Sequence, residues 1–90
     1  MNIERIKRLA NAYLLALANE PQGLPSGHLY ALLAMPAGGS LDEHNAAVAA
    51  IKRAGLVAES HFLLTWTGPE DVRQKLVQAL KADETERSAR

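Results

Sequence analysis

The fold is decided by residues 40–68, which read SLDEHNAAVAAIKRAGLVAESHFLLTWTG. Ser40 and Glu43 have the S-x-x-E spacing of a capping box, in which each side chain accepts a hydrogen bond from the other residue's backbone N–H. Apolar residues then recur at helical spacing as far as Ile51, and Gly55 follows two basic residues. This pattern predicts a helix that begins after Ser40 and ends at Gly55, where glycine takes a left-handed conformation.

The pattern changes from helix to strand after that glycine. Residues 56–58 and 62–66 are rich in β-branched, aromatic and leucine side chains, and the polar residues Glu59 and Ser60 separate them. Two such runs around a short polar break predict a β-hairpin with its tip at Glu59 and Ser60. Leu24, far upstream, is a candidate for a minimal edge strand beside this hairpin.

Two further helices are predicted before this stretch. An apolar stripe runs through residues 3–19, with Asn2 as the N-cap. Pro21 ends that helix because the residue before a proline is pushed out of the α conformation. Ser26 is expected to cap a shorter helix over residues 27–34, and a run rich in glycine and proline then leads to Ser40.

A fourth helix is predicted after the hairpin. Thr67 and Glu70 form a second capping box, and apolar residues continue at helical spacing to about Ala82. The polar residues that follow are expected to be disordered. The chain is therefore predicted to hold one mainly α domain with a small β-hairpin, residues 1–82, and a polar tail, residues 83–90.

Composition excludes several classes of protein. The chain has no cysteine, which excludes disulfides, thiolate metal sites and cysteine nucleophiles. No apolar run approaches the roughly 18 residues that a membrane span needs, and the N-terminus lacks the apolar core of a signal peptide. We therefore expect a cytoplasmic protein that does not bind a membrane. Ten basic and ten acidic side chains give a formal net charge of zero, whereas nucleic-acid-binding domains are usually basic.

Two short motifs in this order carry a family resemblance. The residues AAIKRAGLV, 49–57, match the L-x-x-x-G-L-V exit from a recognition helix into a wing. The residues LTWTG, 64–68, match the L-T-x-x-G entry to a last helix. With three helices, a short two-stranded wing and a C-terminal helix, the chain resembles the winged helix-turn-helix superfamily, and it looks closest to small bacterial and phage members.

The resemblance implies that the helix after Ser40 enters the major groove of duplex DNA and that the wing touches the backbone beside it. Asn45 could pair with an adenine edge, and Lys52 and Arg53 could bind phosphate. The chain is therefore expected to be a homodimeric transcriptional regulator, with its first or last helix as the dimer surface. The groove-facing positions would be Asp42, Glu43, Asn45, Ala46, Ala49, Lys52 and Arg53, and the wing tip would add His61.

The residues also support a different class of function. Asp42 and Glu43 stand where the helix would meet DNA, and acidic groups there repel phosphate. Small side chains at Ala46, Ala49 and Ala50 would suit close approach of another helix. The alternative hypothesis is a protein-docking module without DNA binding, which would bind a second copy or a larger complex through this helix or the last one.

An enzyme is not expected. His28, His44 and His61 have neither metal-ligand nor catalytic-triad spacing, so no metal, no cofactor and no catalytic residue is predicted. His44 falls in the apolar stripe of its helix and is expected to be a semi-buried side chain with its hydrogen bonds satisfied.

Overall fold

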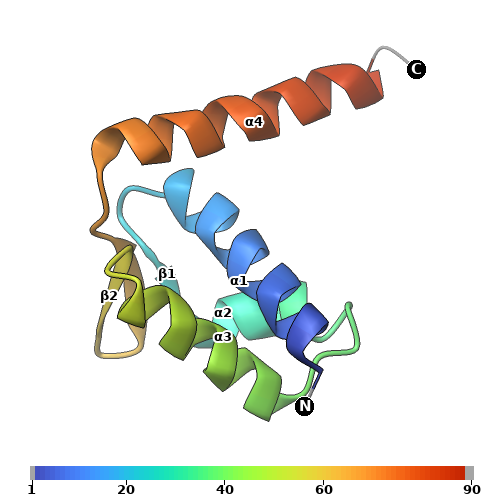
Figure 1. The fold of residues 1–90 in the computed structure, drawn as a ribbon, viewed down its shortest axis with the longest axis vertical. Helices are drawn as coiled ribbons and strands as arrows, with labels where there is room; N and C mark the ends of the chain where they lie inside the picture. The colour runs from blue at the N-terminus through green and yellow to red at the C-terminus, as the bar shows by residue number, and fades with distance from the viewer. Residues whose placement is uncertain (1, 89–90) are drawn as a thin grey trace.

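The first helix, α1 (Ile3–Ala18), lies at the centre of the structure, a computed structural model that describes residues 2–88 (Figure 1). Asn2 is its N-cap, as predicted, because the Asn2 side chain accepts a hydrogen bond from the N–H of Arg5. The helix buries one face and contacts elements from all later parts of the chain. The buried residues of α1 are Leu9, Tyr13, Leu17 and Ala18.

The second helix differs from the prediction at its start and in its pitch. α2 (Ser26–Leu29) has Pro25 at its N-cap position, so Ser26 is the first helical residue and its side chain does not cap the helix. The hydroxyl of Ser26 instead lies 3.0 Å from a ring nitrogen of His44. α2 continues directly into a π-helix, η1 (Tyr30–Ala34), a rare geometry that apolar periodicity does not predict.

The third helix, α3 (Leu41–Arg53), has the predicted boundaries. Both hydrogen bonds of the capping box are present, from the N–H of Glu43 to Ser40 Oγ and from the N–H of Ser40 to Glu43 Oε1. Gly55 follows the helix with a φ of +77°, the left-handed conformation that favours glycine. The chain then turns directly into the sheet.

The sheet has three antiparallel strands in the order β1-β3-β2: β1 (Leu24–Pro25), β2 (Val57–Ser60) and β3 (Leu63–Trp66). The predicted edge strand at Leu24 is confirmed, since Leu24 pairs with Leu64. The predicted hairpin tip at Glu59 and Ser60 is wrong, because both residues belong to β2 and the turn is formed by His61 and Phe62.

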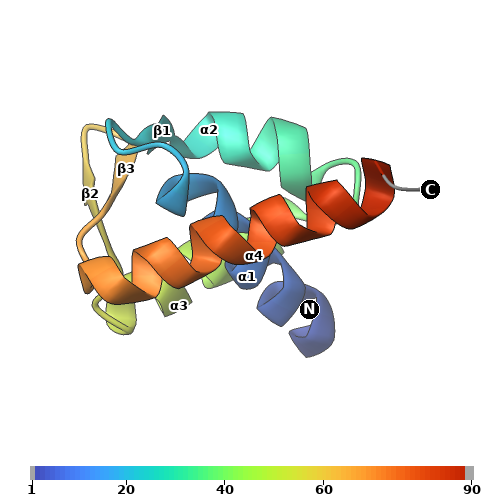
Figure 2. The same cartoon turned by 90° about the horizontal axis from the view of Figure 1, so that it is seen from above.

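The last helix, α4 (Glu70–Ser88), crosses α1 and lies on the side of α1 away from α3 (Figures 1 and 2). The capping box predicted at its start is not formed among the described residues. The N–H of Thr67 donates to the carbonyl of Leu56, and the Glu70 carboxylate accepts from Arg73 and Gln74. Arg73 also donates to the carbonyl of Ala18 and so ties α4 to the end of α1.

α4 extends past the predicted end near Ala82. The predicted tail, residues 83–90, therefore falls largely within the bounds of this helix, and positions 89 and 90 lie outside the described residues. In the part of the chain that the structure describes, no helix is long and apolar enough to cross a membrane. Across residues 2–88, four helices and a small sheet make a mainly α domain whose element order is consistent with a winged-helix-like topology.

Candidate functional site

The outward face of α3 carries most of the residues that were predicted to meet DNA. Asn45, Ala49 and Arg53 are exposed and follow one another at four-residue spacing, which places them on one side of the helix. Lys52 is also exposed, whereas Ala46 is half-buried at the edge of this face. α4 does not cover the face, because it packs on the other side of α1.

Lys52 is held in an ion pair with the β2–β3 hairpin. Its Nζ lies 3.0 Å from Glu59 Oε1 on β2, and both groups remain partly accessible to solvent. The contact brings the hairpin beside α3, but it also neutralises a cation that was predicted to bind phosphate. Sequence spacing gave no sign of this pair, because Glu59 was assigned to the hairpin tip.

Glu43 does not face outward, which corrects its predicted place on the groove-facing surface. Its side chain is almost fully buried and accepts hydrogen bonds at the N-terminal ends of two helices. The donors are the N–H of Asn2 at 2.8 Å, the N–H of Ser40 at 3.0 Å and Arg5 Nη1 at 3.0 Å. These bonds, with the backbone donors Ser40 and Asn2 as the largest influences, lower the pKa of Glu43 to about 2.

The position of Glu43 has two consequences. It fixes the start of α3 against the start of α1, since one carboxylate joins the N-cap residues of both helices. It also removes one of the two acids that were expected to repel DNA, which leaves Asp42 exposed in the first turn. The outward face of α3 is therefore close to neutral, because Asp42 and Arg53 are both exposed and Lys52 is paired with Glu59.

The turn between β2 and β3 contains the last predicted site residue, His61. This residue is exposed and has a φ of 52°, and its Nδ1 lies 3.1 Å from Ser60 Oγ. The next residue, Phe62, also has a positive φ, of 65°, and is 79% exposed. Sequence reasoning missed Phe62 because an apolar residue after a polar break was assigned to the strand interior.

A second group of polar residues lies buried between the helices. The hydroxyl of Tyr13 on α1 is 2.6 Å from Nδ1 of His44 on α3, and Nε2 of His44 is 3.0 Å from the hydroxyl of Ser26 on α2. Tyr13 and His44 are buried, and the ring of Tyr30 makes an edge contact with His44. The prediction that His44 has its hydrogen bonds satisfied is confirmed, and its burial is more complete than expected.

The direction of these hydrogen bonds depends on the tautomer of His44. When the Tyr13 hydroxyl donates to Nδ1, Nε2 carries the histidine hydrogen and donates it to Ser26; in the other tautomer both bonds run in the opposite direction. Burial lowers the pKa of His44, against the nearby Glu59 carboxylate, and raises that of Tyr13 to about 12. The group joins three helices through two hydrogen bonds.

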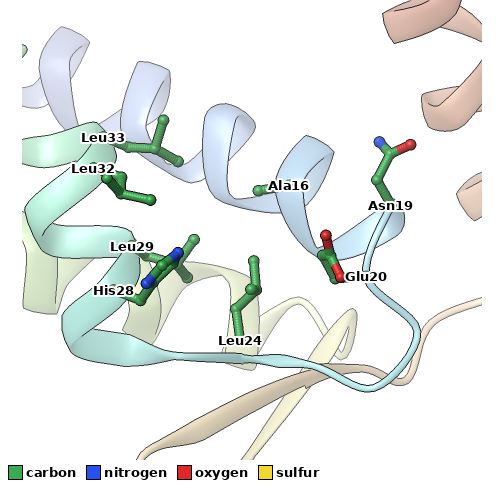
Figure 3. Close-up of a pocket in the computed structure, with 8 residues that line it drawn as sticks. All are labelled: Ala16, Asn19, Glu20, Leu24, His28, Leu29, Leu32 and Leu33. Carbon is green, nitrogen blue, oxygen red and sulfur yellow. The ribbon is translucent and has the colours of Figure 1, made fainter.

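A hollow lies elsewhere, between the end of α1, β1 and the helical segment α2–η1 (Figure 3). Its volume is about 250 Å³, and its walls are mainly apolar. Among the described residues, no group of three or more histidine, aspartate or glutamate side chains is placed to hold a metal ion. The residues that line the hollow include Ala16, Glu20, Leu24, His28, Leu29 and Leu33.

Comparisons of this chain with protein-family models, with curated proteins and with solved structures give no match.

Proposed function

We propose that the chain is a winged-helix protein that binds duplex DNA as a homodimeric regulator, with α3 in the major groove. The observation that carries the proposal is the uncovered outward face of α3, on which Asn45, Ala49 and Arg53 line up beside the hairpin. α4 packs on the side of α1 away from α3 and so leaves this face uncovered (Figure 1).

The proposal fits a DNA-binding surface that is rigid but weakly charged. The Glu43 carboxylate holds α3 to α1, so the helix meets DNA in one fixed orientation. Asn45 has the donor and acceptor geometry that pairs with adenine, and Arg53 can contact phosphate. Lys52 can bind phosphate after it leaves Glu59, since the pair is partly exposed. With about one or two phosphates neutralised per copy, binding is expected to be weak and to fall moderately with salt.

The test measures the binding of a fluorescently labelled duplex by anisotropy at several salt concentrations. R53A is expected to weaken binding and to reduce the salt slope by about one. E59Q is expected to strengthen binding, because it frees Lys52 and removes a negative charge. K75A, which changes an exposed cation on α4, is the matched control and should leave binding unchanged.

The proposal fails if no binding appears at about 100 μM protein and low salt, the weak limit of ordinary non-specific DNA binding. It also fails if R53A and K75A weaken binding equally, because the contact would then not involve α3.

A second function, protein docking through α3, is favoured by one observation. Ala49 and Ala50 are exposed, and the nearby Lys52 charge is neutralised by Glu59, so this part of the helix offers a flat and nearly uncharged surface. A49R separates the two proposals. An added cation on this face should strengthen DNA binding, whereas the larger side chain should block a helix that packs against the alanines.

A further inference from the structure

The wing presents an aromatic side chain to solvent in a conformation that such residues rarely adopt. His61 and Phe62 are consecutive non-glycine residues with positive φ, and Phe62 is 79% exposed. The turn is held from outside, because the carbonyl of Phe62 accepts a hydrogen bond of 2.7 Å from the N–H of Ser26. A two-residue hairpin turn needs positive φ at both positions, and asparagine or glycine is the usual residue there. A phenylalanine at this position keeps a large apolar group in water, for which contacts within one copy give no reason.

The apolar hollow between α1, β1 and α2–η1 is complementary to such a group. Leu24, Leu29 and Leu33 form its apolar walls, and Figure 3 shows Glu20 and His28 on opposite sides of it. Leu32 at its edge is 59% exposed. A hollow of about 250 Å³ is smaller than most sites for drug-sized ligands, and it suits a single large side chain.

The aromatic group and the hollow are neighbours on the molecule. Ser26, which bonds to the carbonyl of Phe62, lies between Leu24 and His28 in the chain, and both of these residues line the hollow. β1 therefore separates the two features by a short distance. When a projecting group and a hollow lie side by side, a two-fold axis can relate two copies so that the group of each copy enters the hollow of the other. The same contact is then made twice.

We propose that two copies of this chain associate by placing Phe62 of each copy into the α1–β1–α2 hollow of the other. A second copy fits because the formal net charge of zero imposes no long-range repulsion between copies. A polar contact is also available locally, since His61 would arrive beside Phe62 at a hollow whose edge carries the Glu20 carboxylate, which can accept a hydrogen bond from an imidazole N–H. This association does not depend on DNA binding, and the surface differs from the outward face of α3.

The contact is small, so the dimer is expected to be weak, with a dissociation constant on the order of 0.1 mM. The test is sedimentation velocity from about 10 μM to about 1 mM protein without nucleic acid, a range that spans this constant. F62N removes the aromatic group and places a residue that tolerates positive φ, so the fold is retained. L32D puts a charge at the edge of the hollow. Both variants are expected to weaken association by about tenfold or more.

L41D is the matched control, because Leu41 is 57% exposed, nearly as exposed as Leu32, and lies at the start of α3. It should associate like the unmodified chain. A mixture of F62N and L32D adds a sharper test: the first variant keeps its hollow and the second keeps its Phe62, so the mixture should recover part of the association that each variant loses alone.

Three results would overturn the proposal. The first is an unmodified chain that stays monomeric up to about 1 mM, well above the expected dissociation constant. The second is a loss of association in L41D equal to that in L32D, and the third is a mixture of F62N and L32D that associates no better than either variant alone. The last result would mean that Phe62 does not enter the hollow. Because no DNA is present, each outcome is independent of whether α3 binds DNA, although a monomeric chain would also contradict the homodimeric part of the proposed regulator.

Discussion

Replacing Tyr13 with phenylalanine should destabilise the domain, because it removes the hydroxyl group that is hydrogen-bonded to His44. The Tyr13 hydroxyl shares a hydrogen bond of 2.6 Å with Nδ1 of His44, and both side chains are buried. Without the hydroxyl, Nδ1 becomes a buried polar atom without a partner, which costs about 1–3 kcal/mol. For a domain of this size each kcal/mol lowers the melting temperature by about 4–8 °C. Urea unfolding followed by circular dichroism at neutral pH measures the loss directly.

Tyr30 provides a matched control for this experiment. Its ring centre is 5.2 Å from that of His44, yet its hydroxyl has no hydrogen bond within the described residues. Y30F should therefore change the free energy of unfolding by less than about 0.5 kcal/mol. Equal losses in Y13F and Y30F, or no loss in Y13F, would refute the assignment of the buried hydrogen bond.

A double variant tests the same reasoning from the other side. H44L alone leaves the Tyr13 hydroxyl buried without a partner, so it should also be destabilised. Combining Y13F with H44L removes donor and acceptor together, and the pair should lose less than the sum of the single losses. Ser26 is half-buried and can bond to water when His44 is absent. Strict additivity would show that the two side chains do not interact.

The remaining predictions concern pH, the capping box and a glycine. Stability should fall as pH drops below about 6.5, because the pKa of His44 is lowered in the folded state and the unfolded chain binds the proton more readily. It should fall again between pH 4.5 and about 2, where the Glu43 carboxylate with its lowered pKa becomes protonated. Melting temperatures across this range should show both steps, and E43Q should lack the second. S40A should cost about 1 kcal/mol in chemical unfolding, the usual loss for an N-cap. G23A should be destabilised by more than about 1 kcal/mol, because φ is +92° and a Cβ atom would lie 2.6 Å from the carbonyl oxygen of Leu64. The control G27A has open space around the added atom and should be neutral or slightly stabilising.

Local patterns were enough to predict most of the fold. The capping box at Ser40, the Asn2 cap, the Gly55 stop and the edge strand at Leu24 all follow from short-range chemistry, and the structure contains each of them. The hairpin turn could not be placed in the same way. Two-residue turns with positive φ are usually recognised by asparagine and glycine, and His61-Phe62 carries neither signal.

The parts of the candidate site that were missed depend on contacts between distant residues. Glu43 was assigned to the outward face because helical spacing does not show that Asn2 and Arg5, about forty positions away, lie within hydrogen-bond distance. Ser26 was assigned as a cap for the same reason, since its bond to His44 forms only when α2 and α3 meet. Periodicity predicts which face of a helix is buried, but it does not identify the partner of a buried polar group.

The Tyr13–His44–Ser26 chain has a consequence for how uniquely this protein packs. Its interior is dominated by leucine and alanine, whose side chains can interlock in several nearly equivalent ways. A hydrogen-bond chain that runs from α1 through α3 to α2 favours one alignment of the three helices, because a slip of one turn in α1 or α2 breaks one of its bonds and a slip in α3 breaks both. Replacing all three residues with apolar ones of similar size would therefore give a domain that still folds but samples several helix registers, visible as broadened side-chain resonances. In this small helical core, the hydrogen-bonded polar residues select one helix alignment among the several that apolar packing allows.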